Sequence, residues 1–70
     1  MQPRKNVVIH EEDFSSLTIM KPFSDGYHNH LIVVHEDAYG EMSARLTTHN
    51  DLKIRLSLSD EEFDELLNKL

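Results

Sequence analysis

The chain has 70 residues and carries 13 Asp and Glu against 7 Lys and Arg, so its formal net charge is −6 at pH 7. A chain of this length forms one small domain that buries only about 60% of the surface its unfolded form exposes. Its apolar runs are far shorter than the roughly 20 residues that cross a bilayer, and the absence of cysteine excludes disulfides and thiolate metal sites.

The first third of the chain predicts a basic tail followed by one or two strands. We expect residues 1–5 to form a flexible N-terminal tail and residues 6–10 to be a candidate short strand. Three adjacent carboxylates over residues 11–13 would repel one another in a strand ladder, so they predict a turn. Residues 14–21 alternate apolar and polar side chains, the period of a strand with one buried face, and Pro22 ends this strand because it has no N–H for the ladder.

The middle of the chain predicts two more strands joined by turns. The Asp25-Gly26 pair is typical of a hairpin turn. Residues 30–35 form the next expected strand, and its continuous aliphatic run indicates burial on both faces. Gly40 suits a left-handed backbone conformation in the following turn. Residues 41–48 alternate again, with three residues expected to face inward: Met42, Ala44 and Leu46.

The last part of the chain predicts a strand that runs into a helix. Residues 52–58 alternate at period two, which predicts a further strand. Ser59 and Glu62 are spaced as a capping box at the start of a helix over residues 59–70. The apolar residues of this helix recur at the spacing of a single stripe: Phe63, Leu66, Leu67 and Leu70.

Together these elements predict an α+β fold in which residues 6–70 form a single ββββα-type domain. The sheet would be an antiparallel four-stranded meander, or five-stranded if residues 6–10 also pair, packed on one face by a single C-terminal helix. The opposite sheet face would stay uncovered. By alternation, that face would display basic and hydroxyl side chains beside part of the aliphatic central strand: Ser43, Arg45, Thr47, Lys53 and Arg55, with Thr18 and Met20 around them.

Charge is segregated in this predicted fold. Most acids fall in turns and in the helix, whose acidic surface would carry Asp60, Glu61, Asp64 and Glu65. The sheet face would be mildly basic and partly apolar. Both surfaces are candidate partner-binding sites, although outward Lys and Arg are also what an ordinary half-exposed sheet carries.

The sequence contains no motif that predicts catalysis. It lacks a phosphate-cradling glycine loop, a nucleophile elbow and a cysteine nucleophile, so we expect no enzyme activity and no cofactor. His28 and His30 lie on one side of a strand at a spacing that can chelate Zn²⁺ or Ni²⁺. A third ligand would have to be Asp25, His10 or His49, and without one at readable spacing the sequence predicts no metal site.

Two functional hypotheses follow, from different classes. The first is a small acidic, cytoplasmic, non-enzymatic protein-binding module, an inhibitor or adaptor that acts on a nucleic-acid-processing protein, as in phage and mobile-element accessory proteins. The second is a single-stranded nucleic-acid-binding protein that uses the open sheet face. The expected order of four strands and one helix over residues 14–70 resembles the topology of Whirly and Pur-type domains, which dimerise and bind single strands across their sheets.

The net charge bears on both hypotheses. A charge of −6 repels phosphate backbones, which disfavours nucleic acid as a partner and favours protein. The aliphatic run over residues 31–34 also predicts a homodimer, since pairing two sheet faces would remove its outward side chains from water. A purely structural subunit is a third alternative.

Overall fold

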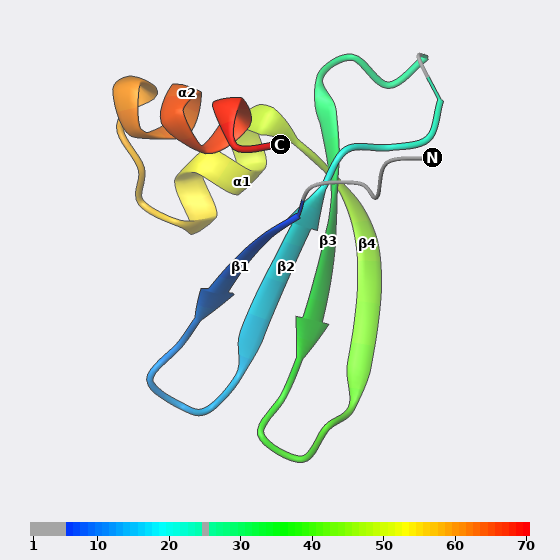
Figure 1. Cartoon of the computed structure of the whole chain (residues 1–70), viewed down its shortest axis with the longest axis vertical. Coiled ribbons are helices and arrows are strands. Elements are labelled where there is room, and N and C mark those ends of the chain that lie inside the picture. The colour runs from blue at the N-terminus through cyan, green and yellow to red at the C-terminus, as the bar shows by residue number, and fades with distance from the viewer. Residues whose placement is uncertain (1–5, 25) are drawn as a thin grey trace.

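The computed structural model describes residues 6–24 and 26–70, so the predicted tail over residues 1–5 and Asp25 of the predicted hairpin turn lie outside the described residues. Four strands precede two helices (Figure 1). The strands are β1 (Val7–His10), β2 (Ser16–Met20), β3 (His30–Glu36) and β4 (Met42–Thr48), and the helices are α1 (His49–Arg55) and α2 (Asp60–Asn68).

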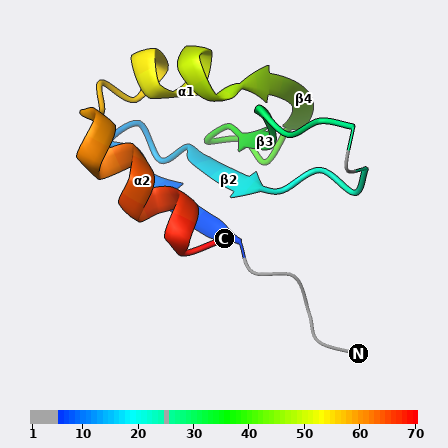
Figure 2. The same cartoon turned by 90° about the horizontal axis from the view of Figure 1, so that it is seen from above.

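The strands form one antiparallel sheet in the order β1-β2-β3-β4, so each strand pairs with its neighbour in the sequence. This confirms the α+β class and the four-stranded meander, and the strand predicted for residues 6–10 is β1. The view from above shows both helices on one side of the sheet (Figure 2). The sheet therefore has one covered face and one open face.

The hydrophobic core lies between the covered face and the two helices. Alternate residues of β2 and β3 point into it, α1 adds one side chain and α2 adds two. The buried members are Leu17, Ile19, Leu31, Val33, Leu52, Phe63 and Leu66. Each such burial contributes roughly 1.5–3 kcal/mol relative to exposure, and a core of this size leaves a marginally stable domain.

The predicted strand over residues 52–58 is wrong, because α1 covers its first part. Thr48 is the N-cap of α1, and its Oγ1 accepts a hydrogen bond from the Asp51 N–H at 3.1 Å. Leu52 is buried, whereas Ile54 is 67% exposed. Residues two apart share a face on a strand but are turned by about 200° on a helix. The apolar and polar residues that alternate in this segment therefore do not lie alternately in the core and in solvent.

Helix α1 ends where Ser57 takes a left-handed conformation, with φ of 55°. The Leu58 N–H then donates to the Lys53 carbonyl at 3.0 Å, which satisfies one of the free carbonyls of the last turn. The chain turns sharply here and enters α2, so the single predicted C-terminal helix is the second of two.

The start of α2 confirms the predicted capping box. The Glu62 N–H donates to Ser59 Oγ at 3.2 Å, and the Ser59 N–H donates to Glu62 Oε1 at 3.0 Å. The hydrogen bond with the Ser59 backbone, and then the hydrogen bond with the Ser59 side chain, lower the pKa of Glu62. The predicted left-handed glycine is also confirmed, since Gly40 has φ of 84°.

The prediction of which β4 residues face the helices is wrong, because the other alternate set of residues faces them. In the register of β3 with β4, Val33 lies opposite Arg45 and Leu31 lies opposite Thr47. Because Leu31 and Val33 point into the core, Arg45 and Thr47 lie on the covered face as well. The residues predicted to face inward lie on the open face instead: Met42, Ala44 and Leu46. A shift of one residue exchanges the two faces of a strand completely.

Candidate functional site

The open face of the sheet is apolar at its centre. Cross-strand pairing builds two adjacent rows on this face. One row contains Val8, Thr18, Val34 and Ala44, and the other contains Met20, Ile32 and Leu46. Met42 extends the apolar surface along β4, where it pairs with Glu36. These eight residues (Val8, Thr18, Met20, Ile32, Val34, Met42, Ala44 and Leu46) are called the open face; Glu36 is not one of them.

The open face is accessible where it reaches the edges of the sheet. Met42 is 67% exposed and Leu46 is 45% exposed on edge strand β4, and Val8 is 51% exposed on edge strand β1. Ile32 and Val34 at the centre are partly buried by their neighbours. The prediction that Thr18, Met20 and one set of central-strand aliphatic residues lie on this face is confirmed.

The prediction that basic residues lie on the open face is wrong. Ser43, Arg45 and Thr47 are on the covered side of β4, because they alternate with the apolar residues. Arg55 is in the last turn of α1. Lys53 is bound to an acid, with 2.6 Å between its Nζ and Asp60 Oδ1. The hydrogen bond and then the charge of Lys53 lower the pKa of Asp60.

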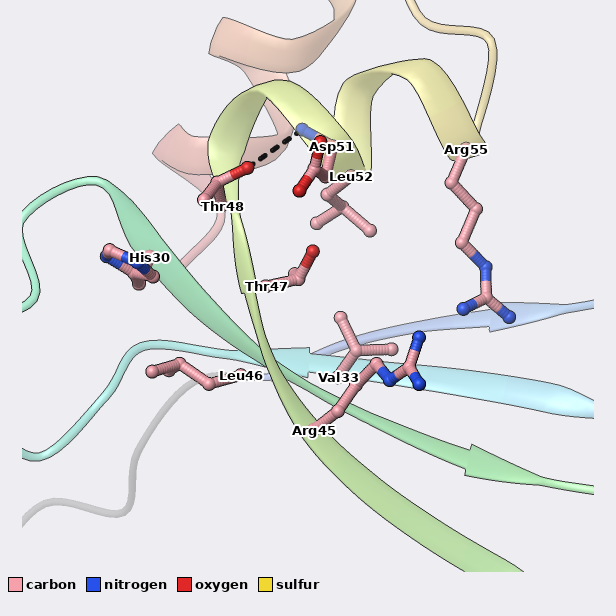
Figure 3. Close-up of a pocket in the computed structure, with 9 residues that line it drawn as sticks. All are labelled: His30, Val33, Arg45, Leu46, Thr47, Thr48, Asp51, Leu52 and Arg55. Carbon is pink, nitrogen blue, oxygen red and sulfur yellow. Dashed lines mark hydrogen bonds between the residues drawn. The ribbon is translucent and has the colours of Figure 1, made fainter.

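Most of these basic and hydroxyl residues meet in a cleft between β4 and α1 (Figure 3). The cleft has a volume of about 490 Å³, and Arg45, Thr47 and Arg55 line it together with Val33 and Leu52. An adjoining hollow of about 270 Å³ shares Val33, Arg45 and Arg55 and adds Ser43. Four of the five residues predicted to form one surface therefore do come together, on the other side of the sheet: Ser43, Arg45, Thr47 and Arg55.

The acids form two separate surfaces. The acidic residues predicted on the helix surface are exposed on α2: Asp60, Glu61, Asp64 and Glu65. The β1–β2 and β3–β4 turns lie at the same end of the sheet (Figure 1). These turns and the end of β3 carry the second acidic surface, the acidic end: Glu11, Glu12, Asp13, Glu36, Asp37 and Glu41. Hydrogen bonds from the Ser15 hydroxyl and the Ser15 N–H lower the pKa of Asp13.

Three of the five histidines, His28, His30 and His49, lie toward the other end of the sheet, whereas His10 and His35 lie beside the acidic end. The His30 ring packs edge-on against Tyr27, and His30 Nδ1 is buried without a hydrogen bond from a described residue. The His49 ring packs against Phe63 with 5.5 Å between ring centroids. Burial, and then the electrostatic interaction with His30, lower the pKa of His49. Among residues 6–24 and 26–70, no three His, Asp or Glu side chains converge as metal ligands, and Asp25 lies outside this set.

Comparisons with models of protein families, with curated proteins and with solved structures were made for the whole chain. None of them finds a match. Within residues 14–70 the observed order is three strands and two helices, so the expected strand order on which the likeness to Whirly and Pur-type domains depended is not found. In the described part of the chain, neither helix has the length and apolar character needed to cross a membrane.

Two features were not predicted from the sequence. One is α1, and the other is that the apolar residues of β4 lie on the open face. A signal for α1 was present: Thr48 and Asp51 have the spacing of an N-terminal capping pair, and Lys53 and Arg55 suit a helix C-terminus. No comparable local signal exists for β4, because alternation shows which residues share a face and not which face the helices cover.

Proposed function

We propose that this chain is a small non-enzymatic protein-binding module that contacts its partner with the open face. The observation that carries the proposal is the uncharged, largely aliphatic surface opposite the helices, formed by one cross-strand row over all four strands and a second row over β2, β3 and β4. Apolar surface left in water forgoes about 25 cal/mol per Å² of burial. Contiguous exposed apolar surface on a small protein is typical of an interaction site.

The surroundings of the open face indicate the chemistry of the partner. The acidic end borders it with six carboxylates and, within residues 11–15 and 37–41, no Lys or Arg. Phe14 and Tyr39 are almost fully exposed in the same two turns, where aromatic side chains can anchor an interface. The complementary partner is a protein with an apolar patch next to basic residues.

Such a partner supports the more specific proposal of an inhibitor or adaptor. Proteins that process nucleic acids carry basic surfaces that attract phosphate. An acidic domain with an apolar docking face can occupy that surface and exclude the nucleic acid by charge. Origin in a phage or mobile element and a cytoplasmic location stay predictions.

Self-association through the open face is expected to be weak. Four strands about 4.8 Å apart and about five residues long, at about 3.3 Å per residue, present a flat area of roughly 320 Å² per copy. Two such faces have a combined flat area of roughly 640 Å², well below the roughly 1,200 Å² buried by stable interfaces. A hetero-partner that also contacts the acidic end would bury more, so we favour it over a homodimer.

Binding of single-stranded nucleic acid stays a prediction, and it now lacks the basic open face on which it depended. Titration of a fluorescent single-stranded oligonucleotide at about 0.15 M salt is expected to show weak binding or none, because a charge of −6 opposes it. Tight binding under these conditions would favour this alternative over the protein-binding module.

The protein-binding proposal is tested with matched surface variants. Leu46→Lys places a charge on the open face, whereas Ile54→Lys makes a similar change at an exposed site on α1. Immobilised parent and variants are compared for the proteins they retain from a host lysate, and retained proteins are then purified and titrated. We expect binding that survives Ile54→Lys and is lost with Leu46→Lys. Equal retention by the two variants would contradict the proposal.

A further inference from the structure

We propose that Arg45 and Arg55 form a binding site for an oxyanion, the group shared by phosphate esters and carboxylates, in the cleft between β4 and α1. This site is on the covered side of the sheet, and neither of its two arginines is an open-face residue, although Leu46 also lines the cleft. The proposal is therefore independent of the proposed function, and either one can fail alone.

The two arginines reach the cleft from different elements. Arg45 lies on β4 opposite Val33, and Arg55 is in the last turn of α1, which follows β4 directly. Figure 3 shows both guanidinium groups extending toward the same space from the strand below and the helix above. A rigid strand and a capped helix thus hold two planar, permanently charged groups on one cleft.

The charges at this site are not balanced by the protein. The only ion pair within residues 6–24 and 26–70 joins Lys53 to Asp60, so neither arginine has an acid within 4.0 Å in that part of the chain. This holds although acids outnumber bases almost two to one. Asp51 lines the same cleft, but its carboxylate lies more than 4.0 Å from both guanidinium groups and forms no ion pair with them. Two cations on one cleft repel each other, and a bound anion would relieve that repulsion.

The lining of the cleft suits a small charged ligand. Val33 and Leu52, which are 2% and 1% exposed, present an apolar floor, and polar interactions strengthen beside such a surface. Thr47 lines the cleft and offers a hydroxyl donor to ligand oxygens, and Ser43 offers a second one in the adjoining hollow. A volume of about 490 Å³ lies within the usual range for ligand sites. Each guanidinium can donate two parallel hydrogen bonds to an oxyanion.

The alternative explanation for Arg45 is that its aliphatic stem simply shields Val33 from water. That role needs no ligand, and methionine would fill it about as well. The two explanations therefore differ in what Arg45→Met does to anion binding.

The experiment follows the Nε–H resonances of Arg45 and Arg55 by nitrogen-15 NMR. Inorganic phosphate is titrated in one arm and succinate in the other, with ionic strength held constant by chloride. We expect both resonances to shift together and to saturate with at least one anion. The arm that saturates at the lower concentration identifies phosphate or carboxylate chemistry as the preferred source. The proposal would be overturned if the chemical shifts changed linearly with anion concentration in both arms, without saturation, or if chloride alone produced the same changes.

Matched variants make the test specific. Arg45→Met and Arg55→Gln are each expected to weaken anion binding roughly tenfold or more, since a charged donor pair is lost. Lys69→Gln removes the same charge from the exposed C-cap residue of α2 and should change binding by no more than about twofold. Amide resonances of Val33 and Leu52 report whether the core is intact. If Arg45→Met disturbs them, the exposed Arg55→Gln variant decides alone, and parent-like binding by it refutes the site.

Discussion

Leu52 and Ile54 provide a direct test of the assignment of residues 49–55 as a helix. On α1, Leu52 is 1% exposed and belongs to the core, whereas Ile54 is 67% exposed. Leu52→Ala should therefore lower the free energy of unfolding by about 3 kcal/mol, through lost burial and the cavity left behind. Ile54→Ala should change it by about 0.5 kcal/mol or less, since alanine favours helix slightly more than isoleucine.

This difference is large for so small a domain. At about 0.05–0.15 kcal/mol per residue, the whole chain has roughly 4–10 kcal/mol of stability, so Leu52→Ala removes a large share of it. Urea unfolding followed by circular dichroism measures both variants. With a slope of about 1 kcal/mol per M, the Leu52→Ala midpoint falls by about 3 M and the Ile54→Ala midpoint hardly moves. Similar shifts in the two midpoints would show that both residues share one face, as on a strand, and would refute α1.

Three further predictions concern capping, pH and assembly. Thr48→Ala and Ser59→Ala should each cost about 1 kcal/mol in urea unfolding, because each removes an N-cap acceptor; unchanged midpoints would contradict the two caps. The pKa of His49 is lowered on folding, so the unfolded state takes up protons first, and the free energy of unfolding should fall as pH drops below about 6.5, until the folded-state pKa is passed. His49→Gln should remove this decrease in the free energy of unfolding. The carboxylates with lowered pKa values change the free energy of unfolding only below about pH 4.5. Light scattering at about 10 µM should give a mass near 8.2 kDa, and a dimer there would mean that more than the open face is buried.

The second helix could be predicted because its determinants are local. Ser59 and Glu62 satisfy each other's backbone groups within one turn, and the apolar stripe is long enough to show helical spacing. Phe63 and Leu66 are indeed buried. Neither feature depends on the position of the sheet.

The first helix could not be predicted by the same route, because its apolar pattern misleads. Residues 52, 54, 56 and 58 are all aliphatic, which is typical of a strand. Leu52 is buried and Leu56 and Leu58 are partly buried against the core, but Ile54 is exposed. Seven helical residues are too few to reveal a period of 3.6. Burial of Leu52 in the core, together with the Thr48 cap, decides the conformation of this segment.

The candidate site was predicted in part, for a related reason. Alternation along β4 correctly grouped Ser43, Arg45 and Thr47, and Arg55 joins them in the cleft. Alternation could not say which face of an edge strand the helices would cover. The one reliable signal for the open face was β3, whose unbroken aliphatic run requires both sheet faces to be apolar there.

The orientation of β4 is the feature that stability alone explains least. Its polar residues point toward the covered side, where Arg45 lies beside buried Val33, and its apolar residues point away from both helices. The opposite orientation would extend the core beneath α1 and remove Met42 and Leu46 from water, a gain of roughly 1.5–3 kcal/mol for each fully buried side chain. A sequence that instead places apolar residues on the open face and arginine on the covered side forgoes that gain in a domain with little stability to spare. The proposed docking face would account for the apolar β4 residues on the open face. The proposed anion-binding cleft would account for the arginine on the covered side.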